Sequence, residues 1–165
     1  MSKPGYRTGQ KVAYAGSGAG FIDGRENKEY GGIRTTYIVF HSADGTVTRR
    51  APIANTENIR PLLSITKLNE ALEQLLKPRR VKRKVRLKKQ ELKQILHSND
   101  LAEICRLAAD TNIFLPGVGI NEREACEIAI KIIASEVMYV KDMSPVKARE
   151  LVEHQLKQAV ENSFT

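Results

Sequence analysis

The segment Arg60–Pro78, RPLLSITKLNEALEQLLKP, decides the fold class, because the pattern of apolar residues changes within it. Before it the chain resembles a series of strands. Within it, Ser64 can cap a helix whose apolar residues recur every three or four positions. These apolar residues are Ile65, Leu68, Leu72, Leu75 and Leu76. The sequence therefore predicts an α+β fold, a β module followed by a helical bundle, with the junction near residues 60–64.

Residues 3–61 consist of short stretches rich in β-branched and aromatic residues, separated by turns that contain glycine. Asp44-Gly45, between two such stretches, is the clearest hairpin signal. Four or five short strands within about 60 residues imply a small, strongly curled sheet or barrel. Strands are predicted over residues 12–14, 19–22, 35–40 and 46–51, with turns at residues 16–18, 31–32 and 44–45.

The spacing of apolar residues after residue 63 predicts an all-α bundle of about five helices. A second helix opens in a basic run, and a third begins at Asn99 or Asp100. Asn121 with Glu124 forms a capping box for a long fourth helix, and Ser144-Pro145 starts the last. The predicted apolar faces are Val81, Val85, Leu92, Ile95 and Leu96, then Leu101, Ile104, Cys105 and Ala108, then Ile128, Ile132, Ile133 and Val137, then Val146, Leu151, Val152 and Leu156. We therefore divide the chain into a β module, residues 1–62, and a helical domain, residues 63–165.

Positive charge is concentrated in one run, residues 77–89, which reads KPRRVKRKVRLKK. Nine of its 13 positions are Lys or Arg and none is acidic, whereas the rest of the chain has 18 basic and 19 acidic residues. Cations at helix spacing repel one another, and a polyanion that neutralises them relieves the repulsion. The candidate nucleic-acid contacts are Arg79, Arg80, Lys82, Arg83, Lys84, Arg86, Lys88 and Lys89.

Other interpretations of this basic run are a solvated helix face, a flexible charged linker and a membrane-surface helix. We favour nucleic acid over the first two because the run has no acidic residue to balance its charge. A membrane surface ranks last, because the apolar face is narrow and lacks Trp or Phe anchors. The absence of aromatic residues from the run also disfavours stacking on single strands.

The chain shows no motif for catalysis, for a metal site or for a cofactor. His41, His97 and His154 lie in different predicted elements without a ligand-spaced partner, so we interpret them as surface or boundary residues. Cys105 and Cys126 lie in apolar helical patterns, as small core residues of a protein in a reducing compartment do. We therefore expect a non-enzymatic protein with no cofactor and no bound metal.

The glycine-rich segment Gly16–Gly20, GSGAG, has the wrong spacing for a dinucleotide-binding loop. A strand pattern follows it where a helix should begin, so turn glycines are the better interpretation. The N-terminus carries no apolar signal core, and no apolar run approaches the roughly 18 residues that span a bilayer. We expect a cytoplasmic protein that does not associate with membranes.

Several short segments, spaced along residues 6–160, together resemble one known family. They are YRTGQKVAY at 6–14, GAGFI at 18–22, Tyr37-Ile38-Val39, Arg50-Ala51-Pro52-Ile53, Ile59-Arg60, Ser98–Ile104 and Ser135-Glu136-Val137. The first two resemble the opening F-K-x-G-D-x-V-V-Y-P-x-x-G-V-G-x-I of the CarD/CdnL bacterial transcription regulators. The later ones resemble, in order, the family's Y-x-V, basic-x-P-x, L-R, S-G-D-I-x-E-V and S/G-E-L segments.

The resemblance implies a Tudor-like N-terminal module that binds the β subunit of RNA polymerase, and a helical domain that contacts double-stranded promoter DNA. In the family the subunit pairs with the exposed edge of the sheet, a form of strand addition. By position, Lys28 and Arg50 match the family's basic contacts. Residues 37–40 and 46–50 would form or flank the docking surface, so Tyr37, Ile38 and Arg49 are further candidates.

One departure concerns a tryptophan that the family carries as W-x-x-R and wedges into the minor groove. This chain has no Trp, and the equivalent position falls on Val85 or on a neighbour. An aliphatic wedge between base steps is physically possible. Core packing is an equally good interpretation, because Val85 also lies on the predicted apolar stripe with Leu92.

The resemblance thus implies a monomeric, nucleoid-associated regulator that stabilises the open promoter complex. Two alternatives stay open on the residues alone. One is a nucleoid- or repair-associated DNA-binding protein that never engages polymerase, and the other is an RNA- or ribosome-associated module.

Overall fold

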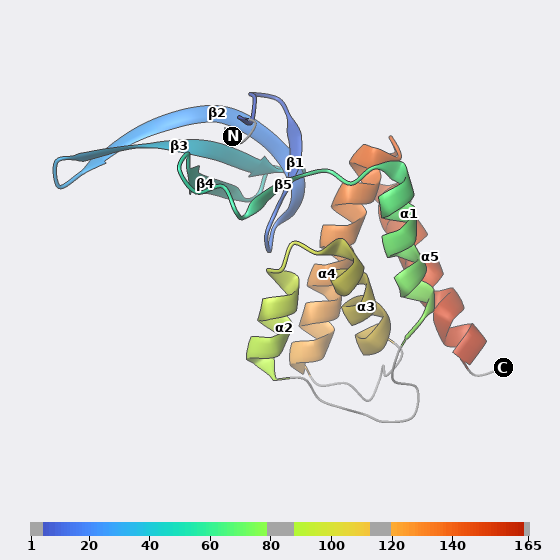
Figure 1. Ribbon diagram of the computed structural model, residues 1–165. Helices are drawn as coiled ribbons and strands as arrows, with labels where there is room; N and C mark the ends of the chain where they lie inside the picture. The colour runs from blue at the N-terminus through green and yellow to red at the C-terminus, as the bar shows by residue number, and fades with distance from the viewer. Residues whose placement is uncertain (1–4, 79–87, 113–119, 164–165) are drawn as a thin grey trace.

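The change of apolar pattern within residues 60–78 coincides with a change of architecture in the computed structural model, which describes residues 5–78, 88–112 and 120–163 (Figure 1). A five-stranded antiparallel sheet is followed by a helical bundle. Each half has its own hydrophobic core. The predicted α+β class is therefore confirmed, while the division at residue 62 stays a prediction.

The sheet has the strand order β4-β3-β2-β1-β5, and every neighbouring pair is antiparallel. The strands are β1 (Lys11–Tyr14), β2 (Gly18–Tyr30), β3 (Ile33–Ser42), β4 (Thr48–Pro52) and β5 (Ile59–Pro61). One face of the sheet covers a core of Val12, Ile22, Ile38, Phe40, Ala51 and Ile59. β5 lies outside the four strands predicted from the sequence, and it pairs with β1.

β2 and β3 are much longer than predicted, because they continue past the sheet as a two-stranded ribbon, residues 27–36 (Figure 1). β4 reaches only to the Tyr37↔Pro52 pair, whereas β2 and β3 stay paired as far as Tyr30↔Ile33. Gly31 and Gly32, with φ of 57° and 81°, close the ribbon in the left-handed conformation that two-residue hairpin turns need.

The helices are α1 (Ile65–Glu73), the short 3-10 helix η1 (Gln74–Leu76), α2 (Lys89–Leu96), α3 (Leu101–Asn112), α4 (Ile120–Val140) and α5 (Pro145–Ser163). Ser64 and Ser144 cap α1 and α5 as predicted: the Ser64 hydroxyl accepts from the Lys67 N–H and the Ser144 hydroxyl from the Lys147 N–H, both at 3.2 Å. α4 packs against α3 and α5, and it also contacts β2.

Two details of the helical prediction are wrong, and a third lies outside the described residues. α4 begins at Ile120, so Asn121 lies inside its first turn and not before it. Ile128 and Val146 are 43% and 67% exposed, although the apolar spacing predicted them as buried. The described part of α2 begins at Lys89, and the predicted positions Val81 and Val85 lie outside the described residues.

A buried ion pair joins the two halves. Arg60 of β5 donates from Nη1 to Glu136 Oε2 at 2.8 Å and from Nη2 to Glu136 Oε1 at 2.7 Å. The Leu63 N–H donates to the same carboxylate at 2.9 Å, and Glu136 is 1% exposed. Because the guanidinium and carboxylate are planar and pair through two bonds, they fix orientation as well as distance.

Asn99 completes this junction. Its carbonyl accepts from Arg60 Nε at 2.8 Å, and its side-chain amide donates to the carbonyls of Ala13 and Asn58 at 3.2 Å. Asn99 has a φ of 57°, in the left-handed region that asparagine tolerates better than most residues. The β module is therefore held against the helical bundle at several points and by directional bonds.

Candidate functional site

The sheet face opposite the core carries three of the five predicted polymerase-binding residues. Paired residues of neighbouring strands share a face, and residues alternate along each strand. The register therefore places Lys28, Tyr37 and Arg50 together, with Glu26 between them. We call this surface the outer face, and it comprises Glu26, Lys28, Tyr30, Ile33, Tyr37 and Arg50.

Glu26 links the two cations of the outer face. Its Oε2 accepts from Arg50 Nε at 3.0 Å, and its Oε1 lies 3.5 Å from Lys28 Nζ. The hydrogen bond from Arg50 is the main reason that the pKa of the Glu26 carboxyl lies below its usual range. The carboxylate thus stays ionised and positions both cations, with a net positive charge left on the face.

The other two predicted residues lie on the core side. Ile38 is 2% exposed and belongs to the core of the sheet, so its side chain is not available to a partner. Arg49 pairs with Phe40 in the register and donates from Nε to Ser17 Oγ at 3.1 Å. The sequence placed all five residues in one region, but it did not separate the two faces.

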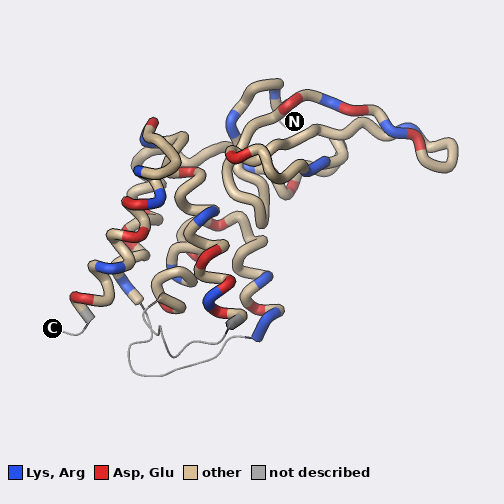
Figure 2. The backbone as a smooth tube through the Cα atoms, turned by 180° about the vertical axis from the view of Figure 1, so that it is seen from behind, with Lys and Arg blue, Asp and Glu red and all other residues tan. Residues whose placement is uncertain are grey.

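The ribbon ends in an apolar pair on the outer face. Tyr30 and Ile33 lie opposite each other next to the turn, and they are 65% and 69% exposed. Charged residues alternate in sign along the ribbon, as Figure 2 shows. An exposed aromatic and an exposed aliphatic side chain side by side on a projecting ribbon are typical of a protein contact.

β4 is an edge strand of the sheet, with β3 as its one strand partner among the described residues. Its outer backbone groups face away from the sheet, and Arg49 and Arg50 follow one another along it. Such an edge can accept an added strand from another chain. β5, the opposite edge, leads directly into the junction with the helices.

The described elements that flank the basic run, η1 and α2, reach the end of the bundle that lies farthest from the sheet (Figures 1 and 2). η1 ends and α2 begins there, and Lys77, Lys88 and Lys89 are exposed. The candidates Arg79, Arg80, Lys82, Arg83, Lys84, Val85 and Arg86 lie outside the described residues.

The glycine-rich segment packs where the sheet meets the helices. A Cβ on Gly18 would lie 2.6 Å from Ser135 Oγ, and a Cβ on Gly16 would lie 2.6 Å from His97 Nε2. The Ala19 N–H donates to Ser135 Oγ at 2.9 Å. The interpretation as turn glycines is correct for Gly16 and Gly18, whose φ angles are 80° and 81°. The sequence did not show that this turn also lies very close to α4.

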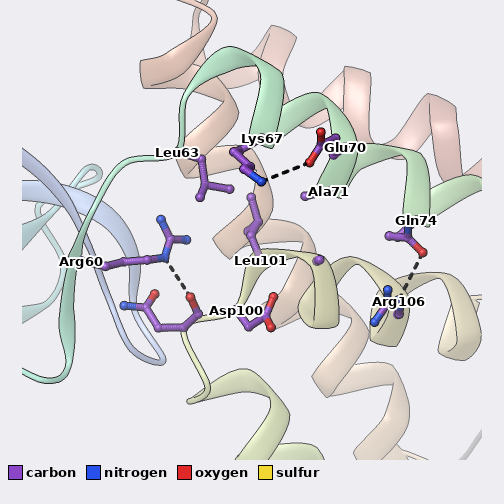
Figure 3. A pocket seen from close by; sticks show the side chains of 11 residues that line it. Arg60, Leu63, Lys67, Glu70, Ala71, Gln74, Asp100, Leu101 and Arg106 are labelled. Carbon is purple, nitrogen blue, oxygen red and sulfur yellow. Dashed lines mark hydrogen bonds and ion pairs between the residues drawn. The ribbon is translucent and has the colours of Figure 1, made fainter.

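A cleft of about 500 Å³ borders the junction, between β5, α1 and α3 (Figure 3). Most of its charged groups are already paired. Lys67 lies 3.7 Å from Glu70, and Arg106 pairs with Glu103 and donates from Nε to Gln74 Oε1 at 3.1 Å. The cleft therefore offers little uncompensated charge to a ligand.

The histidines and cysteines do not gather into a site. His41 lies between Asp23, with Nε2–Oδ2 of 2.9 Å, and Thr48, with Nδ1–Oγ1 of 2.9 Å, on an open sheet surface. Cys105 and Cys126 are buried, and burial raises the pKa of both thiols. Among the described residues no three His, Cys, Asp or Glu side chains lie close enough to hold a metal ion.

Sequence reasoning matched Arg60, Asn99 and Glu136 to family segments but did not predict that they meet. A signal was present, because Glu136 is the single acidic residue in the apolar stretch 128–140, where a buried charge needs a partner. The identity of that partner could not be found from spacing, since 76 positions separate it from Glu136.

Comparison with protein-family models and with curated proteins gives no match. Among the described residues, no helix combines the length and the apolar composition needed to cross a membrane.

Proposed function

We propose that this protein is a transcription regulator that binds the β subunit of RNA polymerase through its sheet and promoter DNA through its basic run. By holding both, it stabilises the open promoter complex. The basic run makes the DNA contact through phosphates, without sequence preference and with a steep dependence on salt. Tethering to polymerase raises the local concentration of this weak contact.

The observation that carries the proposal is the arrangement of the two candidate surfaces. The edge strand β4 lies on the sheet, whereas η1 and α2, which flank the basic run in the sequence, reach the opposite end of the bundle (Figure 1). A polymerase on the sheet and a duplex at the bundle end do not compete for space. The Arg60–Glu136 ion pair between the halves gives such a bridge a defined orientation.

The junction also supports the resemblance to the CarD/CdnL regulators. Three of the resembling segments, Ile59-Arg60, Ser98–Ile104 and Ser135-Glu136-Val137, supply the residues that bond across it. The family segment S-G-D has glycine where this chain has Asn99, and Asn99 adopts a φ of 57°. A left-handed backbone explains why glycine and asparagine serve at the same position.

On the sheet, strand addition to β4 supplies backbone hydrogen bonds, and the outer face supplies side chains. Lys28 and Arg50 give the face its positive charge, while Tyr37 adds an aromatic contact beside them. The apolar pair Tyr30 and Ile33 extends the same face to the tip of the ribbon.

Capture of the purified polymerase β subunit tests the protein contact. We expect the wild type to capture it and the double variant Lys28→Glu, Arg50→Glu to bind at least about tenfold less tightly, because two cations at the contact are reversed. Arg34→Glu is the matched control, since Arg34 is exposed on the opposite face of the same ribbon. Failure of the wild type to capture the subunit contradicts the proposal, and DNA binding without capture favours a nucleoid-associated protein.

Salt titration of duplex binding tests the DNA contact. Replacing Lys82, Arg83, Lys84 and Arg86 by Gln should weaken binding and reduce the slope of log K against log salt by about 0.9 for each phosphate that is no longer neutralised. The control replaces four other lysines, Lys67, Lys141, Lys147 and Lys157, and should leave the slope unchanged. Equal slopes for the first variant and the wild type argue against the DNA role, and preference for structured RNA over duplex favours the RNA-associated alternative.

A further inference from the structure

A second hollow, which we call the junction groove, lies where the sheet meets α4 and the start of α5. Its volume is about 410 Å³, within the range of ligand-binding pockets, which occur preferentially at such interfaces. The β1–β2 turn, the β3–β4 connection and both helices contribute to its lining. The residues that matter for the argument are Ser17, Val47, Arg49, Ile128, Lys131 and Met138.

The groove exposes an apolar surface that the fold itself does not cover. Ile128 is 43% exposed, although Ile132 and Ile133 on the same helix are buried. Val47 and Met138 line the same hollow. A large aliphatic side chain exposed inside a concave, mainly apolar hollow is a position that a partner's apolar side chain can cover.

The rim of the groove is cationic. Arg49 comes from β4, Lys131 from α4 and Arg149 from α5, whereas Asp44 is the one acidic residue among the described residues that line it. Asp44 is occupied, since its Oδ1 accepts from Ser42 Oγ at 2.6 Å and from the Thr46 N–H at 3.0 Å. The groove therefore offers more positive than negative charge to whatever enters.

The three cations differ in how far they are already neutralised. Arg149 is held by Glu127 and Glu153, each at 2.6 Å. Arg49 donates to the neutral hydroxyl of Ser17, and Lys131 has no ion pair within the described part of the chain. Two cations, one from each half of the protein, therefore flank the apolar surface without a compensating carboxylate.

We propose that the junction groove binds an acidic peptide segment of a partner protein that carries at least one bulky apolar side chain. The apolar side chain covers Ile128, and flanking carboxylates pair with Arg49 and Lys131. The cations at the rim favour a partner with negative charge. The apolar lining favours a peptide over a nucleic acid, because phosphates are bound by cations and need no apolar surface. The proposal is independent of polymerase and of the basic run.

Titration of the full chain, followed by ¹⁵N and ¹³C-methyl NMR, tests it with defined probes. The peptide EDELFEDE should bind saturably and shift the signals of Val47, Ile128 and Ile132. The peptides EDESSEDE and KKKLFKKK, which lack the apolar side chains or the acidic charge, should bind at least about tenfold more weakly. Equal binding of either control, shifts confined to other surfaces, no binding, or the same shifts from an oligothymidylate would overturn the proposal.

Two pairs of variants assign the binding to the groove. Ile128→Ser and Lys131→Glu should each weaken binding of EDELFEDE by about tenfold. The matched controls are Ile65→Ser, an isoleucine 48% exposed on α1, and Lys157→Glu, an exposed lysine on α5, and both should bind as the wild type does. Unchanged amide shifts in the sheet show that each variant is folded. Wild-type affinity in folded Ile128→Ser would overturn the proposal, as would equal losses in the controls.

Discussion

At the scale of single residues, Arg60 and Glu136 form an ion pair that is largely shielded from water. Glu136 is 1% exposed, and its two oxygens accept three bonds, two from Arg60 and one from the Leu63 N–H. Pairing two charges away from water costs desolvation that good geometry only offsets, so the pair contributes little net stability. Removing one partner is different, because the other charge is then left buried.

We predict that Arg60→Met destabilises the protein by about 3–5 kcal/mol, because Glu136 loses its guanidinium. The double variant Arg60→Met, Glu136→Leu should recover much of this loss, since no buried charge is left. Urea unfolding of the wild type, both single variants and the double variant gives the coupling energy. Additive losses would mean that the two side chains do not interact.

At the scale of elements, the β1–β2 turn shows how closely the sheet approaches α4. Gly18 has a φ of 81°, and a Cβ there would meet Ser135 Oγ at 2.6 Å and Ile132 Cα at 3.2 Å. Gly31, in the ribbon turn, also has a positive φ, of 57°, but has nothing within 4 Å of the Cβ position. Gly31 is therefore required only for its left-handed backbone, whereas Gly18 is required both for its backbone and for the close packing on α4.

We predict that Gly31→Ala costs about 1–2 kcal/mol, the usual cost of a left-handed alanine. Gly18→Ala should cost more, about 2–4 kcal/mol, because α4 must also move. Chemical denaturation of both variants measures the difference. Equal losses would show that the turn conformation alone matters at Gly18.

The elements that the sequence predicts correctly are those with local signals. Ser64 and Ser144 cap their helices through hydroxyl groups that bind the amides of Lys67 and Lys147, within the same helical turn, so the signal and the effect lie together. After Ile22, neither face of β2 is buried, and its residues are mostly polar. The sequence therefore shows no alternation of apolar and polar residues that would have predicted this part of the strand. Ile128 follows helical spacing but faces the junction groove, which only the packing of the sheet on α4 creates.

The candidate site divides in the same way. The family resemblance grouped Lys28, Tyr37 and Arg50, and the register of the strands places them on one face of the sheet. The sequence alone did not show that Ile38 lies in the core, because a shift of one residue in the register turns a side chain to the other face of the sheet. The Arg60–Glu136 contact depends on tertiary packing, so the local pattern marked Glu136 as a buried charge but did not identify its partner.

At the scale of the whole molecule, the junction makes the sheet and the bundle a single oriented unit. Bonds cross it from Arg60, Asn99 and Ser135. If polymerase and DNA are held together, the gain from tethering depends on how well the link matches the distance and direction between them.

We predict that the double variant Arg60→Met, Glu136→Leu, although folded, gains less DNA affinity from polymerase than the wild type does. The wild type should bind promoter DNA at least about tenfold more tightly when the polymerase is present, and the variant by a smaller factor. Fluorescence anisotropy of labelled promoter DNA with and without polymerase measures both factors. An identical gain in the two proteins would show that orientation across the junction is irrelevant.

The position of the ion pair also limits how such a protein can be recombined. Arg60 lies before the predicted boundary at residue 62, while its partner Glu136 and the Leu63 N–H lie after it. A chimera that exchanged only the β module for an unrelated one would bring a new residue against an unchanged buried carboxylate. The two halves therefore depend on each other through the Glu136 carboxylate. We expect an exchanged β module to give a stable protein only if it supplies an arginine at the position of Arg60.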